Sequence, residues 1–243
     1  MVTVNSDMGE AFGLHSFGND PELVTLIDTA NVACGFHAGD PTVLRETVEL
    51  ALGAGVTVGA HPGLPDLVGF GRREMKLDRG ETADLVRYQV GALVAFLRAH
   101  EAPLDHLKPH GSLYGMAARQ EEIADAICDV AVDYEVPIYG MAGTLHEFVA
   151  ARRGVPFVSE VYVDLTYRAD GSLIIARRPS ATPPELATAR ARLALAAQVV
   201  ECDTGERVSV RPDSICVHSD TPNAPEVARA VRAVVEELAE LGG

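Results

Sequence analysis

Short apolar segments alternate with longer amphipathic segments along most of the chain. The apolar segments predict β-strands at residues 2–5, 31–35, 56–60, 104–108, 136–139, 156–162 and 214–217. Between them, apolar residues recur at every third or fourth position, as expected for helices with one buried face. Leu44, Val48 and Leu52 form one such stripe. The pattern therefore predicts strands separated by helices.

Several helix starts carry recognisable capping residues. Asp20-Pro21 and Asp40-Pro41 each place an aspartate N-cap before a proline of the first turn. Asp78 and Glu81 have the spacing of a capping box. Further helices are expected at residues 121–132, 144–152 and 186–200, and from residue 227 to the C-terminus.

Strands joined through helices pair in parallel by right-handed crossovers. The pattern breaks between residues 163 and 182, where a turn at 169–172 predicts a hairpin, and residues 206–210 predict one more small strand. Seven main strands favour an α/β fold, a distorted seven-stranded parallel (β/α) barrel formed by residues 1–243 as a single domain. An open doubly wound sheet is the alternative, but no G-x-G-x-x-G motif follows the first strand.

The composition of the chain indicates which kinds of binding partner are disfavoured for this protein. The formal net charge of −15 disfavours binding to nucleic acids and to anionic membranes. The longest apolar segments are far shorter than the roughly 20 residues of a membrane-spanning helix. The four cysteines form no C-x-x-C pair, and no signal peptide is recognisable, so we expect a cytoplasmic protein.

Titratable side chains are concentrated where the predicted strands end. In a barrel these ends open on one face, where the loops build the active site. The residues concerned are Asp7 and Glu10 after the first strand, His37 and Asp40 after the second, His61 after the third, Lys108 and His110 at the fourth, Glu160 in the sixth, and His218 and Asp220 after the last. The other four histidines, His106 and His146 among them, lack such a setting and are expected to be incidental.

Two chemical schemes fit these residue types. In one, Asp7, His37 and His61 hold a divalent metal that activates water. In the other, no metal takes part, and Glu10 or Asp7 acts as general base while Lys108 and His110 stabilise an oxyanion. The sequence leaves both schemes open.

Other polar residues are candidates for substrate binding. Arg72 and Arg73, in a glycine-flanked loop, could bind a carboxylate or phosphate in bidentate fashion. Asp40 and Asp220 are candidates too, although each precedes a proline-containing helix start and could act only as a helix cap.

Six motifs, taken in order, resemble the LamB/YcsF family over residues 2 to about 235. They are residues 5–10 (NSDMGE), 33–41 (ACGFHAGDP), 59–63 (GAHPG), 69–73 (GFGRR), 108–114 (KPHGSLY) and 213–218 (DSICVH). The resemblance implies a seven-stranded barrel of the glycoside hydrolase/deacetylase type. It also implies ATP-dependent opening of 5-oxoproline to L-glutamate, with ADP and phosphate as products, together with two partner subunits, B and C.

The resemblance also bears on cofactors and on substrate. Related deacetylase barrels use one aspartate and two histidines for a metal, which supports Asp7, His37 and His61, with His110 as a substitute. The chain has no G-x-x-x-x-G-K-[ST] loop, so we expect ATP to be handled with or by the partners. Leu165 stands where an arginine commonly follows the aspartate at 164, which leaves open another cyclic or acylated amide as substrate. A stand-alone metal-dependent deacetylase and a non-catalytic partner of a carboxylase-like complex are the alternatives.

Overall fold

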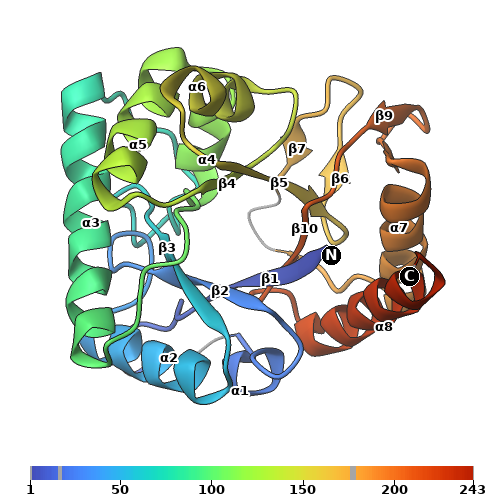
Figure 1. Ribbon diagram of the computed structural model, residues 1–243, viewed down its shortest axis with the longest axis horizontal. Coiled ribbons are helices and arrows are strands. Elements are labelled where there is room, and N and C mark those ends of the chain that lie inside the picture. Colours follow the sequence, from blue (N-terminus) through green and yellow to red (C-terminus); the bar gives the residue numbers. More distant parts are fainter. Residues whose placement is uncertain (1, 16–17, 176–178, 243) are drawn as a thin grey trace.

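The computed structural model describes residues 2–15, 18–175 and 179–242, which form a curled parallel β-sheet surrounded by helices (Figure 1). The six strands of the sheet lie in the order β3-β2-β1-β10-β5-β4, and every pair of neighbours is parallel. Their bounds are Thr3–Met8 for β1, Thr29–Ala33 for β2, Thr57–His61 for β3, Ile138–Gly140 for β4, Phe157–Tyr162 for β5 and Ser214–His218 for β10.

Helices connect these strands and cover the outside of the sheet (Figure 1). Their bounds are Asp20–Leu23 for α1, Pro41–Gly53 for α2, Arg79–Ala99 for α3, Gly111–Ala117 for α4, Glu121–Tyr134 for α5, Leu145–Arg153 for α6, Pro184–Ala197 for α7 and Ala224–Gly242 for α8. Asp40 caps α2 by accepting from the backbone N–H groups of Thr42 and Val43, and Asp78 with Glu81 forms the capping box of α3. None of the described helices combines the length and apolarity that crossing a membrane requires.

The expected strand at residues 104–108 is replaced by a single-residue bridge. Leu107 pairs in parallel with Ala60 of β3 and with Ile138 of β4, so this segment lies between the two edge strands of the sheet. Prolines at 103 and 109 bracket the segment, and a proline has no N–H to extend a ladder. The sheet therefore has six strands where the hydrophobic pattern predicts seven.

Two helix predictions need correction, and one helix was missed. Asn19, not Asp20, is the N-cap of α1, and the Asp20 carboxylate instead accepts from the backbone N–H of Gly9 at 2.7 Å. The helix expected at 186–200 ends at Ala197, because Gln198 takes a left-handed conformation with φ of 53°. The short helix α4 was not predicted.

Two small antiparallel hairpins lie outside the main sheet. Strand β6 (Thr166–Tyr167) pairs with β7 (Leu173–Ile174), which confirms the hairpin expected around residues 169–172. Strand β8 (Val199–Glu201) pairs with β9 (Arg207–Ser209), so the end of the expected helix at 186–200 is a strand instead.

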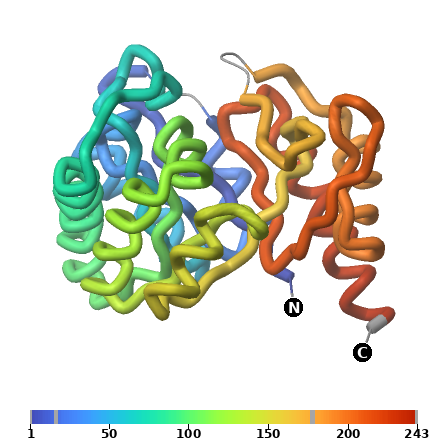
Figure 2. Tube along the Cα trace, turned by 90° about the horizontal axis from the view of Figure 1, so that it is seen from above, coloured from blue at the N-terminus to red at the C-terminus, as the bar shows by residue number. Residues whose placement is uncertain are grey.

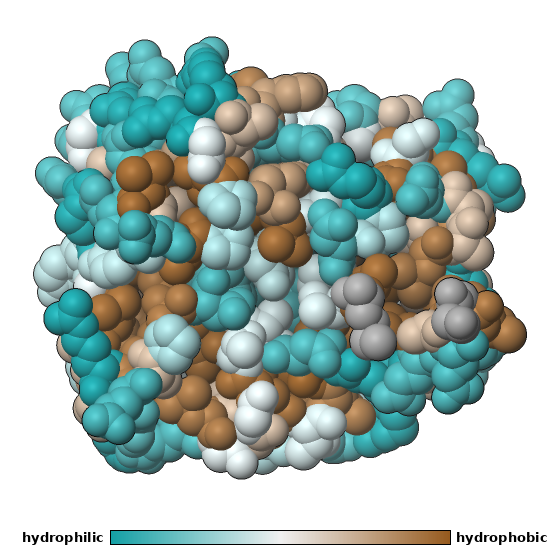
Figure 3. All heavy atoms as spheres, viewed as in Figure 1, coloured by the Kyte–Doolittle hydropathy of each residue, from teal (hydrophilic) through white to brown (hydrophobic). Residues whose placement is uncertain are grey.

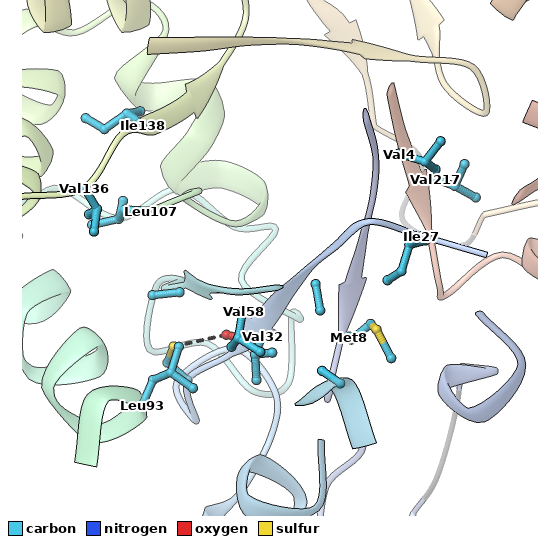
Figure 4. Packing of buried hydrophobic residues seen from close by; sticks show 14 of the residues in the cluster. Val4, Met8, Ile27, Val32, Val58, Leu93, Leu107, Val136, Ile138 and Val217 are labelled. Carbon is cyan, nitrogen blue, oxygen red and sulfur yellow. Dashed lines mark hydrogen bonds between the residues drawn. The ribbon is translucent and has the colours of Figure 1, made fainter. Parts of the chain in front are cut away.

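The apolar core lies between the sheet and its helices, while the inside of the curled sheet is polar. Val4, Met8, Val32 and Val217 belong to the buried apolar cluster (Figure 4). Side chains alternate between the two faces of a strand, and Asn5, the neighbour of Val4, bonds across the inner face to Ser214 of β10. This polar interior leads to the end of the barrel at which the strands finish.

The two ends of the barrel differ in what they carry. The termini lie at one end, and the loops that follow β1 and β3 lie at the other (Figure 2). The face shown in Figure 3, viewed as in Figure 1, has hydrophilic residues over much of its periphery, and apolar patches alternate with neutral and weakly hydrophilic residues across the rest. The candidate site lies where the strands finish, away from the termini.

Candidate active site

A cavity of about 190 Å³ lies at the end of the curled sheet where the strands finish. It gathers side chains from strand ends and loops that are far apart in the sequence. Of the predicted site residues, those that line it are Asp7, His61, Arg72, Lys108, His110, His218 and Asp220. The expectation that strand-end residues meet in one place is therefore supported for these seven.

Lys108 is the central charge at the base of this cavity, and its side chain is 2% exposed. Its Nζ lies 2.9 Å from Asp7 Oδ1 and 3.1 Å from Glu160 Oε1, and it contacts Cys216 Sγ at 3.1 Å. Burial by itself lowers the pKa of Lys108, but the nearby Asp7 carboxylate, Cys216 sulfur and Glu160 carboxylate outweigh burial and raise that pKa well above its ordinary value. The amine is therefore a permanent cation held between two carboxylates.

Asp7 is held ionised beside Lys108. Burial by itself would raise the pKa of Asp7, but its contacts with His61 and Lys108 outweigh burial and hold that pKa well below its ordinary value. Asn31 of β2 also donates to Asp7 Oδ1 at 2.8 Å. In the strand register Asp7 lies opposite Asn31 on one side and His218 on the other, so pairing of the strands places these three groups together.

The polar interior extends below Asp7 through residues that the sequence did not single out. Asn31 also donates to Asn5 Oδ1 at 2.8 Å, and its own Oδ1 accepts from His106 Nε2 at 2.7 Å. His106, expected to be incidental, is fully buried against Gly59, where an added Cβ would overlap the imidazole. The adjacent Asp105, whose Oδ2 lies 2.9 Å from His106 Nδ1, was a signal that the sequence offered.

A second cluster, the histidine cluster, consists of Glu10, His37, His61 and His110. All four residues are buried, and one ligand atom of each lies within 4.8 Å of the others. The rings of His37 and His110 stack with centroids 3.7 Å apart. Close packing needs glycines here, since a Cβ on Gly63 would overlap the ring of His37.

Burial sets the protonation of the histidine cluster. It lowers the pKa of His37 and of His110 well below the ordinary value, and the neighbouring imidazoles add to this effect. It raises the pKa of Glu10, with a further contribution from the Asp7 charge. These groups are therefore costly to charge unless a cation is shared among them.

The side chains that converge overlap only in part with the predicted metal ligands Asp7, His37 and His61. His37 and His61 belong to the histidine cluster as expected, but its carboxylate is Glu10, and His110 is the third imidazole. Asp7 instead groups with Cys216 and His218 and pairs with Lys108. The reason is geometric, because Asp7 lies on β1 and points into the barrel, whereas Glu10 lies in the loop beyond that strand.

His218 is a cationic residue that lines the cavity beside Asp7. Its Nδ1 lies 3.0 Å from Asp164 Oδ1, and its backbone N–H donates to Asp164 Oδ2 at 2.7 Å. Burial lowers the pKa of His218, but Asp164, Asp7 and Asp220 outweigh burial and raise it to about 9. His218 is therefore a protonated acid at neutral pH.

Arg72 and Asp220 form an ion pair at the rim of the cavity, with Arg72 Nη2 donating to Asp220 Oδ2 at 2.7 Å. The Arg72 guanidinium also lies over the Phe70 ring, 5.0 Å from its centroid. Leu165 lines the same cavity. Arg72 is thus a cation placed to meet an anionic ligand there.

Two of the predicted binding residues lie outside this cavity. Asp40 serves as the cap of α2 with one oxygen and accepts from the backbone N–H of Gly13 with the other. Arg73 is paired with Asp66 and turns toward solvent. The helix-cap alternative thus explains Asp40, and a role in substrate binding is not supported by its position.

Comparison with known proteins places these features in a family. The model of the LamB/YcsF family matches residues 2–240. A relative from Tolumonas auensis, named as the A subunit of 5-oxoprolinase, is 45% identical over 238 residues, which cover 96% of this chain and 95% of the relative. A relative of the same name from Thermus thermophilus is 47% identical over 241 residues, covering 97% and 96%.

A solved structure has the same fold. The crystal structure of the lactam utilization protein from Thermus thermophilus matches with a TM-score of 0.89 and 44% identity, covering 98% of this chain and 97% of that one.

Proposed function

The chain belongs to the LamB/YcsF family, and from this premise we propose that it acts as the A subunit of an ATP-dependent 5-oxoprolinase. The reaction opens the lactam of 5-oxoproline and gives L-glutamate, ADP and phosphate. One observation carries the assignment of the chemistry to this chain. A buried ammonium, an ionised carboxylate and a protonated imidazole face one cavity, in Lys108, Asp7 and His218.

The chemistry requires activation of a stable amide. Transfer of a phosphoryl group from ATP to the lactam oxygen makes the ring carbon electrophilic. Water then adds to that carbon, the C–N bond breaks, and the ring nitrogen takes a proton to become the amine of glutamate. A second water releases phosphate from the acyl phosphate that results. The cavity must therefore supply a base for water, an acid for nitrogen and positive charge near the oxygen.

The described residues match these roles. Asp7 is the base, because it is ionised and lines the cavity. His218 is the acid, because Asp164 orients its ring and keeps it protonated. Lys108 stabilises negative charge that develops on oxygen, and Glu160 balances the charge of Lys108 from below. Since Asp7 and His218 are opposite each other in the strand register, base and acid approach the ring from one side of the barrel.

Arg72 binds the substrate carboxylate in this proposal. Its guanidinium is largely buried at the rim and can form a bidentate pair with a carboxylate. Asp220 holds the guanidinium in place until substrate arrives. Leu165 supplies an apolar wall in place of the arginine of the family pattern.

The setting of the reaction belongs to the same proposal. Two further subunits, B and C, take part and handle ATP, and the reaction occurs in the cytoplasm. The segment around Leu107 is the remnant of a seventh strand in a distorted barrel of the glycoside hydrolase/deacetylase type. Residues 1–243 act as one domain.

The test is reconstitution with purified partner subunits. The chain is mixed with subunits B and C of the same organism, ATP and 5-oxoproline, and glutamate is measured. We expect glutamate only when all components are present, and we expect Asp7→Asn to abolish it. The corresponding subunits of Thermus thermophilus serve as a positive control for the assay. Release of glutamate in the absence of this chain would contradict the proposal. So would the absence of glutamate when all components are present and the control assay works.

A stand-alone amidohydrolase is the second candidate, favoured by the histidine cluster beside the cavity. That function predicts hydrolysis of cyclic or acylated amides by this chain alone, without ATP. Turnover under those conditions would replace the proposal above.

A further inference from the structure

The ring nitrogens of His61 and His110 face each other as two hydrogen-bond acceptors. His61 Nδ1 lies 2.8 Å from the backbone oxygen of Lys108, and His110 Nε2 lies 2.8 Å from the backbone oxygen of Phe70. A carbonyl oxygen only accepts, so each of these nitrogens carries the hydrogen of its ring. The remaining nitrogens, His61 Nε2 and His110 Nδ1, are 3.0 Å apart and both present lone pairs.

Two facing lone pairs at this distance repel each other unless a cation lies between them. A proton can relieve the repulsion, but it serves only two acceptors. A carboxylate oxygen and a third imidazole nitrogen lie beside this pair, since Glu10 Oε1 is 3.5 Å from His110 Nδ1 and 3.3 Å from His37 Nε2. Four ligand atoms within 4.8 Å of one another are typical of a metal site, in which ligating histidines donate their other N–H to a carbonyl, as His61 and His110 do here.

We propose that Glu10, His37, His61 and His110 bind one divalent cation at the wall of the cavity. Three imidazole nitrogens and one carboxylate oxygen form a ligand set suited to Zn²⁺ and similar late first-row metals. The charge of the cation offsets the burial of the Glu10 carboxylate and of three histidine rings. Two of the ligands, His61 and His110, also line the cavity, so a fifth ligand can reach the metal from there.

Asp7 is outside this ligand set. Its Oδ1 is engaged by Lys108 and Asn31, and an ammonium 2.9 Å away competes with any metal for that oxygen. Its Oδ2 lies between two histidines, 3.4 Å from His61 Nε2 and 3.7 Å from His218 Nε2. This site therefore differs from the metal site expected from the sequence, in which Asp7, His37 and His61 are the ligands. It also leaves Asp7 available as a base.

The test measures metal binding directly, without substrate. The chain is stripped with a chelator and titrated with Zn²⁺, and its Co²⁺ form is examined for the visible absorption of a tetrahedral site. We expect one metal ion per chain. Glu10→Gln and His110→Asn should each weaken binding by at least about 100-fold, at or beyond the upper range for loss of a supporting residue. Asp7→Asn is the matched control and should keep stoichiometric binding.

Circular dichroism shows which variants fold, and the Co²⁺ spectrum of the unmodified chain tests the site if a variant does not. No stoichiometric binding of Zn²⁺ or Co²⁺ by the unmodified chain would overturn the proposal, and a shared proton would then explain the facing nitrogens. Loss of metal in Asp7→Asn with retention in Glu10→Gln would overturn it as well. Since no turnover is measured, neither result depends on the proposed reaction.

Discussion

Protonation of His146 should limit the stability of the protein in mild acid. His146 on α6 is buried, and its Nε2 donates to the backbone oxygen of Tyr114 at 2.9 Å. Its Nδ1 accepts from the backbone N–H of Met141 at 3.2 Å. The neutral ring satisfies both contacts, whereas a second ring proton would point at the Met141 N–H. Burial accordingly lowers the pKa of His146 from 6.5 to about 4, although its bond to Tyr114 opposes this.

The magnitude follows from this difference in pKa. The unfolded chain binds a proton at His146 near pH 6.5, and the folded chain does so only near pH 4. The stabilisation is therefore fully present above pH 6.5 and is lost as the pH falls to about 4, below which the loss levels off. A pKa difference of about 2.5 corresponds to about 3 kcal/mol, at about 1.4 kcal/mol for each pKa unit.

Urea unfolding followed by circular dichroism at pH 7, 6, 5 and 4 measures this effect. We compare the unmodified chain with His146→Gln, which keeps a donor for Tyr114 but does not titrate. The variant should be less stable at pH 7, and the gap between the two proteins should shrink by about 3 kcal/mol by pH 4. The other buried histidines titrate alike in both proteins and cancel in this difference.

His100→Gln, at an exposed histidine, is the control and should follow the pH dependence of the unmodified chain. A gap between the unmodified chain and His146→Gln that stays constant from pH 7 to pH 4 would refute the reasoning.

Three further outcomes are expected. Lys108→Met leaves two buried carboxylates without their cation. It should abolish glutamate formation and lower the free energy of unfolding by about 3–5 kcal/mol in urea titrations. An unchanged free energy of unfolding would contradict the buried ion pairs. Gly59→Ala places a methyl group against His106 and should lower the free energy of unfolding by about 1–3 kcal/mol. The control is Gly53→Ala, whose methyl group meets no neighbouring atom, and it should lower the free energy of unfolding far less in the same titration. Arg72→Lys removes a bidentate guanidinium and should raise KM for 5-oxoproline about 10-fold or more with a smaller change in kcat; an unchanged KM would exclude Arg72 as the carboxylate ligand.

Local sequence determined most of the elements and the end of the barrel at which the site lies. Capping by Asp40 and by Asp78 with Glu81 depends on residues within one turn of each other, so it was visible without the fold. The alternation of strands and helices fixed parallel pairing, and parallel pairing brings strand ends together. Asp7, Lys108 and His218 therefore met in one cavity as predicted.

The tertiary structure alone decided which of these residues act together. Asp7 and Glu10 are both carboxylates three residues apart, yet one pairs with Lys108 and the other joins the histidine cluster. His106 was expected to be incidental, because it does not stand at the exit of a predicted strand. Its partner Asn31 is 75 residues away in the sequence, so only the fold shows the contact.

The physical reason lies in the range of each interaction. Caps and amphipathic stripes are set by neighbours along the chain. The charge state of a buried group depends instead on which distant side chains share its low-dielectric surroundings. Only the curling of the sheet determines which side chains become such neighbours.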